Sequence, residues 1–218
     1  MNVRHLAFLV WLSLLLVPTA DTEEPGLRVE GGISALKPLG SVGDDVEVGG
    51  ADFTVGAGGY AYVNYRLETS FSVGVRCSWH GLGVSGNGGK PYENASFMSI
   101  LLASTRVFNP DEDIRPFAVG AMGLSWMRWR YAEPHPLAED PTIVLDTDRR
   151  RATTFLLGGG AEIQVGDYWE FLPALHVLLH GWSNHTQWVT QYDDEEKERP
   201  ATPRTVSLEI TVGVARRF

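Results

Sequence analysis

The sequence predicts an all-β fold, an eight-stranded antiparallel β-barrel with up-and-down connections, preceded by a signal peptide. Three observations lead to this prediction. Apolar and polar residues alternate along several segments, long and short connections alternate between those segments, and the longest apolar run lies at the N-terminus. The 218 residues suit one domain, and 24 glycines together with 7 Trp, 7 Tyr and 9 Phe favour strands over helices.

The first 20 residues have the layout of a secretory signal peptide. Arg4 gives a positive start, residues 6–17 form an apolar run broken only by Ser13, and Ala20 is a small residue suited to cleavage. The run is too short to cross a bilayer comfortably, so we expect cleavage after Ala20 and export. A buried helix or an uncleaved anchor is the alternative interpretation of the same run.

Composition and charge argue against several classes of protein. Beyond the signal peptide no apolar stretch approaches the length of a membrane-spanning helix, which argues against a helical membrane protein. The net charge of −9 argues against a nucleic-acid partner, because a protein that binds phosphate backbones needs a basic face. The single cysteine, Cys77, cannot form an internal disulfide, and no Cys/His cluster has the spacing of a zinc site, so we expect no metal and no cofactor.

The last segment, residues 204–218, shows strand periodicity most clearly. Every second residue is apolar and most residues between are polar or small, which is the period of two expected for a strand with two different faces. The apolar set is Val206, Leu208, Ile210, Val212 and Val214. The same alternation predicts strands at residues 26–37, 52–67, 69–81 and 152–165.

Three further segments are less regular. Residues 94–108 and 114–131 carry apolar residues on both parities, and residues 168–183 contain Pro173. Because proline cannot donate to a strand ladder, we expect a bulge or a local gap there. We predict strands at all three, since their lengths fit and helix-start signals are missing. Eight antiparallel strands can close into a barrel that leaves no edge.

Short and long connections alternate strictly along the chain. Short turns are expected between the second and third strands, the fourth and fifth, and the sixth and seventh. The longer connections are residues 38–51, 82–93, 132–151 and 184–203. Membrane barrels of bacteria have this arrangement, with short turns on the periplasmic side and long loops outside, whereas a soluble sandwich has no reason to adopt it.

The charged residues indicate which face of the strands points inward. They gather on the polar parity, and the interior of an eight-stranded barrel is just filled by side chains, where opposite charges can pair. We therefore predict a polar network with a structural role in the lumen. Its predicted members are Arg28, Glu30, Arg66, Arg76, Glu162, Glu170, His176, His180 and Glu209. As a hypothesis, Arg76 with Glu162 or Glu209 forms part of a plug that blocks diffusion.

The apolar parity is then expected to face lipid. The predicted strands are long enough to supply the roughly 9–11 residues of a tilted membrane-spanning strand. Aromatic side chains near strand ends, which suit the lipid–water interface, are expected to form girdles. The girdle candidates are Tyr65, Trp79, Phe108, Trp129, Tyr131, Trp169, Trp182 and Phe218.

Two stretches resemble the outer-membrane β-barrel domain family, which includes small OmpA/OmpX-type barrels. Residues 205–218 resemble its C-terminal assembly signal, an amphipathic last strand with a terminal aromatic residue, here Phe218. Residues 115–123, with the sequence RPFAVGAMG, look like the Pro-aromatic strand with spaced glycines found in that family. The chain stops at Phe218, so no periplasmic domain is expected after the barrel.

The resemblance implies an integral protein of the bacterial outer membrane with a structural or surface-interaction role. Its implied partners are outer-membrane lipids, lipopolysaccharide and, during biogenesis, the barrel-assembly machinery, which reads the last strand by strand pairing. We expect a monomer and no nucleic-acid partner. The expected domains are the signal peptide at 1–20, a short periplasmic segment at 21–25 and the barrel at 26–218.

One motif suggests enzyme chemistry. Residues 180–185, HGWSNH, resemble the His-x-Ser-Asn motif of outer-membrane lipid A deacylases, which use a serine activated by histidine. The match is imperfect, because His180 and Ser183 are three apart and would face opposite sides of a strand, while His185 reverses the order. We predict no enzyme activity and interpret the motif as a loop-entry cluster, with a lipid hydrolase as the alternative.

Two other interpretations stay open. A metal site could be imagined at Glu170, His176 and His180, although lumen filling explains these residues better. A secreted soluble barrel that binds an apolar ligand is the second alternative, and it would require the apolar parity of the last strand to point inward around a cavity. The acidic loops 38–51 and 184–203 are interpreted as solvated surface, with divalent-cation contact beside lipopolysaccharide phosphates as the functional alternative.

Overall fold

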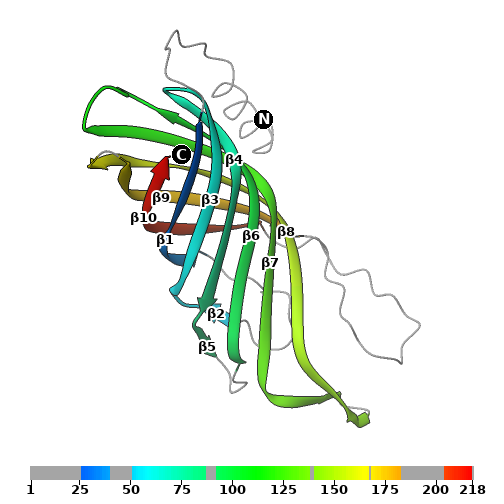
Figure 1. Ribbon diagram of the computed structural model, residues 1–218. Coiled ribbons are helices and arrows are strands. Elements are labelled where there is room, and N and C mark those ends of the chain that lie inside the picture. The colour runs from blue at the N-terminus through cyan, green and yellow to red at the C-terminus, as the bar shows by residue number, and fades with distance from the viewer. Residues whose placement is uncertain are drawn as a thin grey trace.

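Ten strands run through the described part of the chain, and eight of them close into an antiparallel barrel (Figure 1). The computed structural model describes residues 26–39, 51–86, 92–137, 140–166, 168–182 and 204–217. The barrel strands are β1 (Gly26–Leu39), β3 (Gly56–Glu68), β4 (Phe71–Leu82), β6 (Tyr92–Val107), β7 (Ile114–Leu137), β8 (Asp140–Val165), β9 (Trp169–Trp182) and β10 (Arg204–Arg217). Among these residues no helix is long and apolar enough to span a membrane.

Each barrel strand pairs with its neighbours in the chain, and β1 closes the ring by pairing with β10. The closing ladder runs from Arg28 opposite Arg217 to Leu39 opposite Val206, so the first and last strands pair over almost their whole length. A closed ring leaves no strand edge exposed. The predicted eight-stranded up-and-down barrel is therefore confirmed.

The two ends of the barrel differ in their connections. At one end, named here the short-turn end, lie the links from β3 to β4, from β6 to β7 and from β8 to β9, together with the start of β1 and the end of β10. Asn109 and Gly166 have positive φ angles of 51° and 76°, as is common in tight turns. The opposite end is named the long-loop end. There β2 (Ala51–Phe53) pairs with β5 (Val84–Gly86) as a small separate sheet (Figure 1).

Two predicted boundaries are wrong at the long-loop end. The predicted strand 52–67 is divided into β2 and β3, because the Thr54 amide donates to the Gly83 carbonyl and the chain turns there out of the barrel ladder. The predicted loop 132–151 is mostly strand, since β7 continues to Leu137 and β8 begins at Asp140. The segment contains three prolines and three consecutive arginines. The hairpin accommodates the prolines through register shifts.

The proline expected to interrupt a strand does so without a bulge. Pro173 lies within β9 and stands opposite Val212 of β10. On its other side, the β8–β9 ladder is interrupted between the pairs Gly160–Ala174 and Ile163–Phe171, and the register is the same before and after. The structure thus has the local gap that the missing amide hydrogen predicts.

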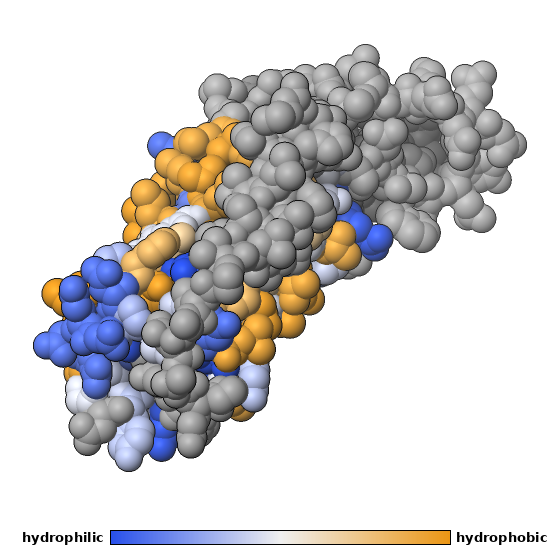
Figure 2. All heavy atoms as spheres, turned by 90° about the horizontal axis from the view of Figure 1, so that it is seen from above, coloured by the Kyte–Doolittle hydropathy of each residue, from blue (hydrophilic) through white to orange (hydrophobic). Residues whose placement is uncertain are grey.

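The faces of the barrel are inverted relative to a soluble protein. Large apolar side chains lie outside, and Figure 2 shows broad apolar areas there, while charged and hydroxyl side chains are buried within. Examples on the outer face are Ile33, Val63, Trp79, Ile100, Leu102, Leu175, Ile210 and Val214. A contiguous apolar surface of this extent needs a nonaqueous environment or a partner.

Candidate functional site

Five charged side chains from five strands meet inside the barrel near the short-turn end. They are Arg28, Arg66, Arg115, Glu162 and Glu170, named here the short-turn ion cluster. Arg28 Nη2 lies 3.0 Å from Glu162 Oε1 and 2.8 Å from Glu170 Oε2. Arg115 Nη2 lies 2.6 Å from Glu170 Oε1 and 3.5 Å from Glu162 Oε2. Arg66 Nη2 lies 3.4 Å from Glu162 Oε2, so each carboxylate faces at least two guanidinium groups.

Strand register brings these charges together. Arg115 on β7 stands directly opposite Glu162 on β8, and Glu30 shares a face of β1 with Arg28 because the two are two residues apart. Glu30 Oε2 lies 3.7 Å from Arg28 Nη1, so that three carboxylates accompany three guanidinium groups. Burying an unpaired charge is far more costly than burying a matched one. The short-turn ion cluster is therefore stabilising only while its charges are balanced.

A second cluster surrounds Glu209 further along the lumen. Arg76 Nη2 donates to both carboxylate oxygens of Glu209, at 2.9 and 2.8 Å. His176 Nδ1 lies 3.1 Å from Glu209 Oε2, since the two residues stand opposite each other on β9 and β10. His80 Nε2 lies 3.4 Å from Glu209 Oε1 and 2.7 Å from Ser34 Oγ. Glu209 is 0% exposed and is held from three sides by charge-assisted or imidazole contacts, which are strong in such an environment.

Glycines make room for the bulky members of this Glu209 cluster. The Arg76 guanidinium lies over the Tyr60 ring, with its carbon 4.9 Å from the ring centroid. The Tyr60 hydroxyl occupies the space that a side chain at Gly213 would need, and the His176 ring does the same at Gly158. A larger residue at either inward position would collide with the cluster. These two glycines thus allow the Tyr60 and His176 side chains to lie close to the backbone, and they are not needed for a turn.

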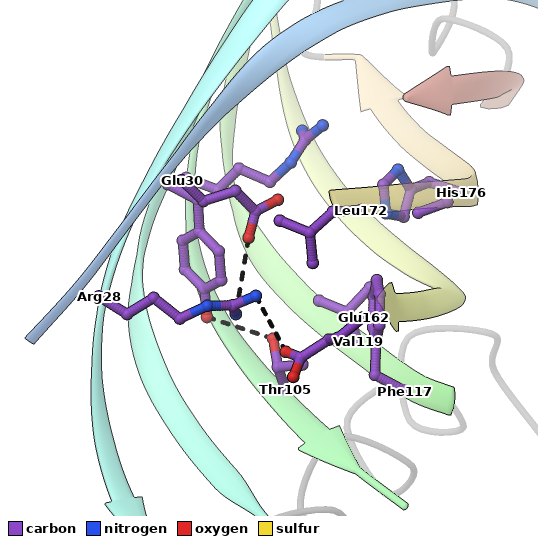
Figure 3. A pocket seen from close by; sticks show the side chains of 11 residues that line it. Arg28, Glu30, Thr105, Phe117, Val119, Glu162, Leu172 and His176 are labelled. Atoms are coloured by element: carbon purple, nitrogen blue, oxygen red, sulfur yellow. Dashed lines mark hydrogen bonds and ion pairs between the residues drawn. The ribbon is translucent and has the colours of Figure 1, made fainter. Parts of the chain in front are cut away.

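A small cavity separates the two clusters. Its volume is about 20 Å³, which is room for about one water molecule. Its lining includes Arg28, Glu30 and Glu162 from the first group together with Arg76 and His176 from the second, and Figure 3 shows the labelled ones around one small space. Apolar side chains such as Leu172 and Val119 complete the wall. Side chains therefore fill this part of the lumen, as expected for an eight-stranded barrel.

Toward the long-loop end the lumen is filled differently. Buried apolar side chains predominate there. Those named here the loop-end core belong to one larger apolar cluster, and they are Leu36, Leu82, Ala95, Phe97, Leu101, Met127, Ala152, Leu156, Leu178 and Trp182. The Thr154 hydroxyl donates to Ser125 Oγ at 2.7 Å and lies 2.9 Å from His180 Nδ1. His180 Nε2 lies 3.0 Å from Ser207 Oγ. Both ring nitrogens of His180 are thus engaged with hydroxyl groups inside the core.

Comparison with known proteins agrees with this architecture. No protein-family model matches the chain, and no curated protein matches it in sequence. Neisserial surface protein A is similar in structure, with a TM-score of 0.58 at 13% identity over 90% of this chain and 100% of that one. A major outer membrane protein from Thermus thermophilus has a TM-score of 0.54 at 14% identity, again over 90% and 100% of the two chains. The fold is that of the small outer-membrane β-barrels.

A third barrel of this kind is the attachment invasion locus protein Ail of Yersinia pestis. Its TM-score is 0.51 at 10% identity, over 90% of this chain and 100% of Ail. Identities this low establish a shared fold and carry no activity from one barrel to another. The individual side chains of the lumen must therefore be interpreted from their own contacts.

The outer-membrane barrel fold places all nine predicted network residues in the lumen, in three groups. Arg28, Glu30, Arg66, Glu162 and Glu170 meet at the short-turn end, and Arg76 and His176 meet at Glu209. His180 lies apart from both groups, in the loop-end core. Glu170, His176 and His180, the imagined metal ligands, therefore do not converge, and among the described residues no group of acidic, His or Cys side chains could hold a metal ion.

The sequence analysis missed two members of these clusters. Arg115 was noticed only as the start of the Pro-aromatic stretch, yet it stands opposite Glu162 and belongs to the short-turn ion cluster. His80 lies on the same strand parity as Arg76, so strand alternation could have found it. Its partners Ser34 and Glu209 could not be found in this way, because they come from strands far away in the sequence.

Trp182 is a correction to the predicted aromatic girdle. It is buried in the loop-end core, and its indole nitrogen donates to Thr205 Oγ1 at 2.7 Å. The even-numbered residues of β9 face inward, and Trp182 follows that parity although it ends the strand. Tyr65, Trp79, Phe108 and Trp169 are exposed on the outside. The other three girdle candidates cannot be placed in this way, because the structure describes neither the side chains of Trp129 and Tyr131 nor any part of Phe218.

The geometry also bears on the two functional alternatives. A hydrolase would need His180 beside an exposed nucleophile, but His180 is 3% exposed and enclosed by hydroxyl groups of the core. Ser183 and His185 lie outside the described residues. A soluble barrel would need the apolar parity of β10 inside, whereas Ile210 is 59% and Val212 is 39% exposed on the outer face. Neither arrangement is supported by the described side chains.

Proposed function

We propose that this chain is an integral protein of a bacterial outer membrane, with a closed polar lumen and a structural or surface-interaction role. One contrast within β10 carries the proposal: Glu209 is 0% exposed, while its neighbour Ile210 is 59% exposed. Water would favour the opposite arrangement, because ionised side chains are rarely buried and large apolar ones usually are. Lipid around the barrel removes the cost of exposing the apolar face.

The dimensions of the barrel support the same proposal. Its shortest strand, β4, has 12 residues, which exceeds the roughly 9–11 needed to cross a bilayer at a tilt. Closure of the ring gives every barrel strand a hydrogen-bonding neighbour on both sides, as a nonpolar solvent requires. The short-turn end is then assigned to the periplasm and the long-loop end to the outside, as in other barrels of this kind.

The lumen network has a structural role in this proposal. The short-turn ion cluster and the Glu209 cluster close the lumen, with room for about one water between them. Such a plug would block the free diffusion of solutes through the barrel. Planar-bilayer recordings of the purified protein should therefore show no large, steady ohmic conductance, and a stable pore would contradict the plug.

The last strand has a second role in this proposal, as the assembly signal. The outward residues of β10 are Val206, Leu208, Ile210, Val212 and Val214, followed at the end of the chain by Phe218. Before the ring closes, the edge that β10 later shares with β1 is free for strand pairing with the barrel-assembly machinery. Deletion of Phe218 is expected to slow insertion in cells without preventing refolding of the purified chain into detergent.

Cell fractionation tests the proposal as a whole. We expect the full chain in the outer-membrane fraction, where unboiled samples should migrate faster on a denaturing gel than boiled ones because the folded barrel is compact and resists detergent. Recovery of a soluble periplasmic or secreted protein would overturn the proposal. The same gel then serves as the folding assay for every variant below.

A further inference from the structure

The small cavity between the two ion clusters is lined by two buried donors that lack a partner among the described residues. Arg76 is 3% exposed, and its Nη2 atom serves both carboxylate oxygens of Glu209, while its Nη1 atom has no hydrogen-bond partner. Arg28 is 2% exposed and has the same feature at Nε. Buried polar groups of native proteins are nearly always hydrogen-bonded to protein or to water. The two donors therefore indicate an acceptor within the cavity.

Carboxylate groups line the same space and have capacity for further hydrogen bonds. Figure 3 shows Glu30 and Glu162 beside Arg28 at the cavity. Glu30 Oε2 lies 3.7 Å from Arg28 Nη1, which is longer than a hydrogen bond, and a carboxylate can accept about four hydrogen bonds. An occupant of the cavity must therefore accept hydrogen bonds from guanidinium groups and donate them to carboxylates.

Size and charge select the occupant. The cavity volume of about 20 Å³ exceeds the roughly 10–15 Å³ that one water molecule needs, and it excludes larger molecules. The charges of the arginines and glutamates around it are already balanced, because three guanidinium groups accompany three carboxylates at the short-turn end and Arg76 accompanies Glu209. A bound ion would add an unpaired charge to the interior, which is costly. Water carries no net charge and is both a donor and an acceptor.

We infer that the cavity binds one water molecule, which accepts a hydrogen bond from Arg76 Nη1 and donates one to Glu30. This water joins the Glu209 cluster to Glu30 and the short-turn ion cluster beside it, so that the charged half of the lumen is one hydrogen-bonded network. It is part of the structure, because its removal leaves a buried guanidinium group without a partner. The inference goes beyond the proposed function and depends only on the folded barrel.

A crystal structure of the full-length protein in detergent tests the inference directly. Crystals are soaked in sodium bromide, because bromide takes the place of chloride and is recognised by its anomalous scattering. We expect one ordered density peak within about 3.2 Å of both Arg76 Nη1 and a Glu30 carboxylate oxygen, without an anomalous signal. A cavity without density, a peak that contacts only one of these two side chains, or a bromide signal would overturn the inference.

Two isosteric substitutions at Ala174, which lines the cavity, measure the need for a hydrogen-bonding occupant. Ala174→Val and Ala174→Thr fill the space equally, but only the threonine hydroxyl can take over a hydrogen bond of the displaced water. The midpoint of urea unfolding should be about 0.5–1 M lower for Ala174→Val than for Ala174→Thr, which corresponds to one hydrogen bond to a charged donor at the usual slope of unfolding against urea. Equal midpoints, or a higher midpoint for Ala174→Val, would overturn the inference, because a dry cavity favours an apolar filling.

A matched control and the folding assay complete the test. Ala61 is exposed on the outward face of β3, and there Ala61→Val should be at least as stable as Ala61→Thr, because no buried donor needs the hydroxyl. If the natural chain fails to form a heat-modifiable barrel in phosphatidylcholine vesicles, the proposed membrane role fails, whereas a folded barrel without the density peak refutes only the water site. The crystallographic test uses the natural chain, so it decides the inference even if neither Ala174 variant folds.

Discussion

The two halves of the lumen solve the same packing problem with different chemistry. At the short-turn end the interior is filled by guanidinium and carboxylate groups from five strands, and at the long-loop end by apolar side chains with a few hydroxyl and imidazole groups. Ion pairs are strong only when every partner is present, whereas apolar packing fails gradually as volume is lost. The halves should therefore respond differently to the same kind of substitution.

The difference also concerns specificity. Arg76 reaches Glu209 across 133 positions of sequence, and Arg66 reaches Glu162 across 96. Such contacts form only when the ring closes in the correct register, because a shift by one residue turns each side chain to the opposite face. Apolar contacts in the loop-end core tolerate more error, since several arrangements fill the same volume. We infer that the charged half fixes the register of the barrel.

The largest effect is expected at the centre of the short-turn ion cluster. Glu162→Ala leaves Arg28, Arg66 and Arg115 with one fewer buried carboxylate, and it should lower the free energy of unfolding by about 3–5 kcal/mol. Urea unfolding in phosphatidylcholine vesicles, followed by the heat-modifiable band, measures this. Gln164→Ala, two residues along β8 at an exposed position, is the matched control and should change stability by less than about 0.5 kcal/mol. Similar losses in the two variants would contradict the importance of charge balance.

Truncation in the loop-end core should have a smaller effect. Leu156 is 0% exposed, and Leu156→Ala should cost about 2–4 kcal/mol through the cavity it leaves. Leu157→Ala removes the same atoms from the outward face, where lipid chains can fill the space, so we expect a clearly smaller loss. The same unfolding assay compares the pair. A larger loss at position 157 would mean that the inward and outward faces are exchanged.

The sequence was sufficient to predict the number of barrel strands and the inward parity of most charged residues. Alternation on β1, β4 and β10 separates polar from apolar positions so cleanly that Arg28, Arg76 and Glu209 could be assigned to the lumen. The partners of these residues could not be predicted. They depend on how far each strand slides along its neighbour, and a strand's own sequence does not carry that register.

Other features escaped prediction for local reasons. On β6 the inward residues include Phe97 and Leu101 and the outward ones Met98 and Ile100, so apolar character does not distinguish the faces. The loop-end core was therefore hidden. Trp182 was assigned to the girdle from its place at a strand end, although its parity, shared with His176 and His180, indicated the lumen. Parity is the more reliable guide, because it follows from backbone geometry.

A double-mutant cycle sharpens the contrast between the halves. Arg76→Met and Glu209→Leu each leave a buried charge without its main partner, while the double variant removes both charges. The coupling free energy from the four unfolding curves should be on the order of 2 kcal/mol, with the double variant more stable than at least one single variant. Additive losses would show that the two side chains act independently, despite their contact.

The smallest loss of stability is expected at the few hydroxyl and imidazole groups that lie within the loop-end core. Thr154→Val keeps the shape of the side chain but removes the hydroxyl that lies between Ser125 and His180, and it should cost about 1–2 kcal/mol because buried polar groups lose a partner. Thr153→Val, at the adjacent exposed position, is the control and should be neutral or slightly stabilising against lipid. If Thr154→Val were as harmful as Glu162→Ala, the loop-end half would depend on its hydrogen bonds as strongly as the other half depends on its charges. The distinction between the two halves would then be lost, because a neutral network cannot incur the penalty of an unpaired ion.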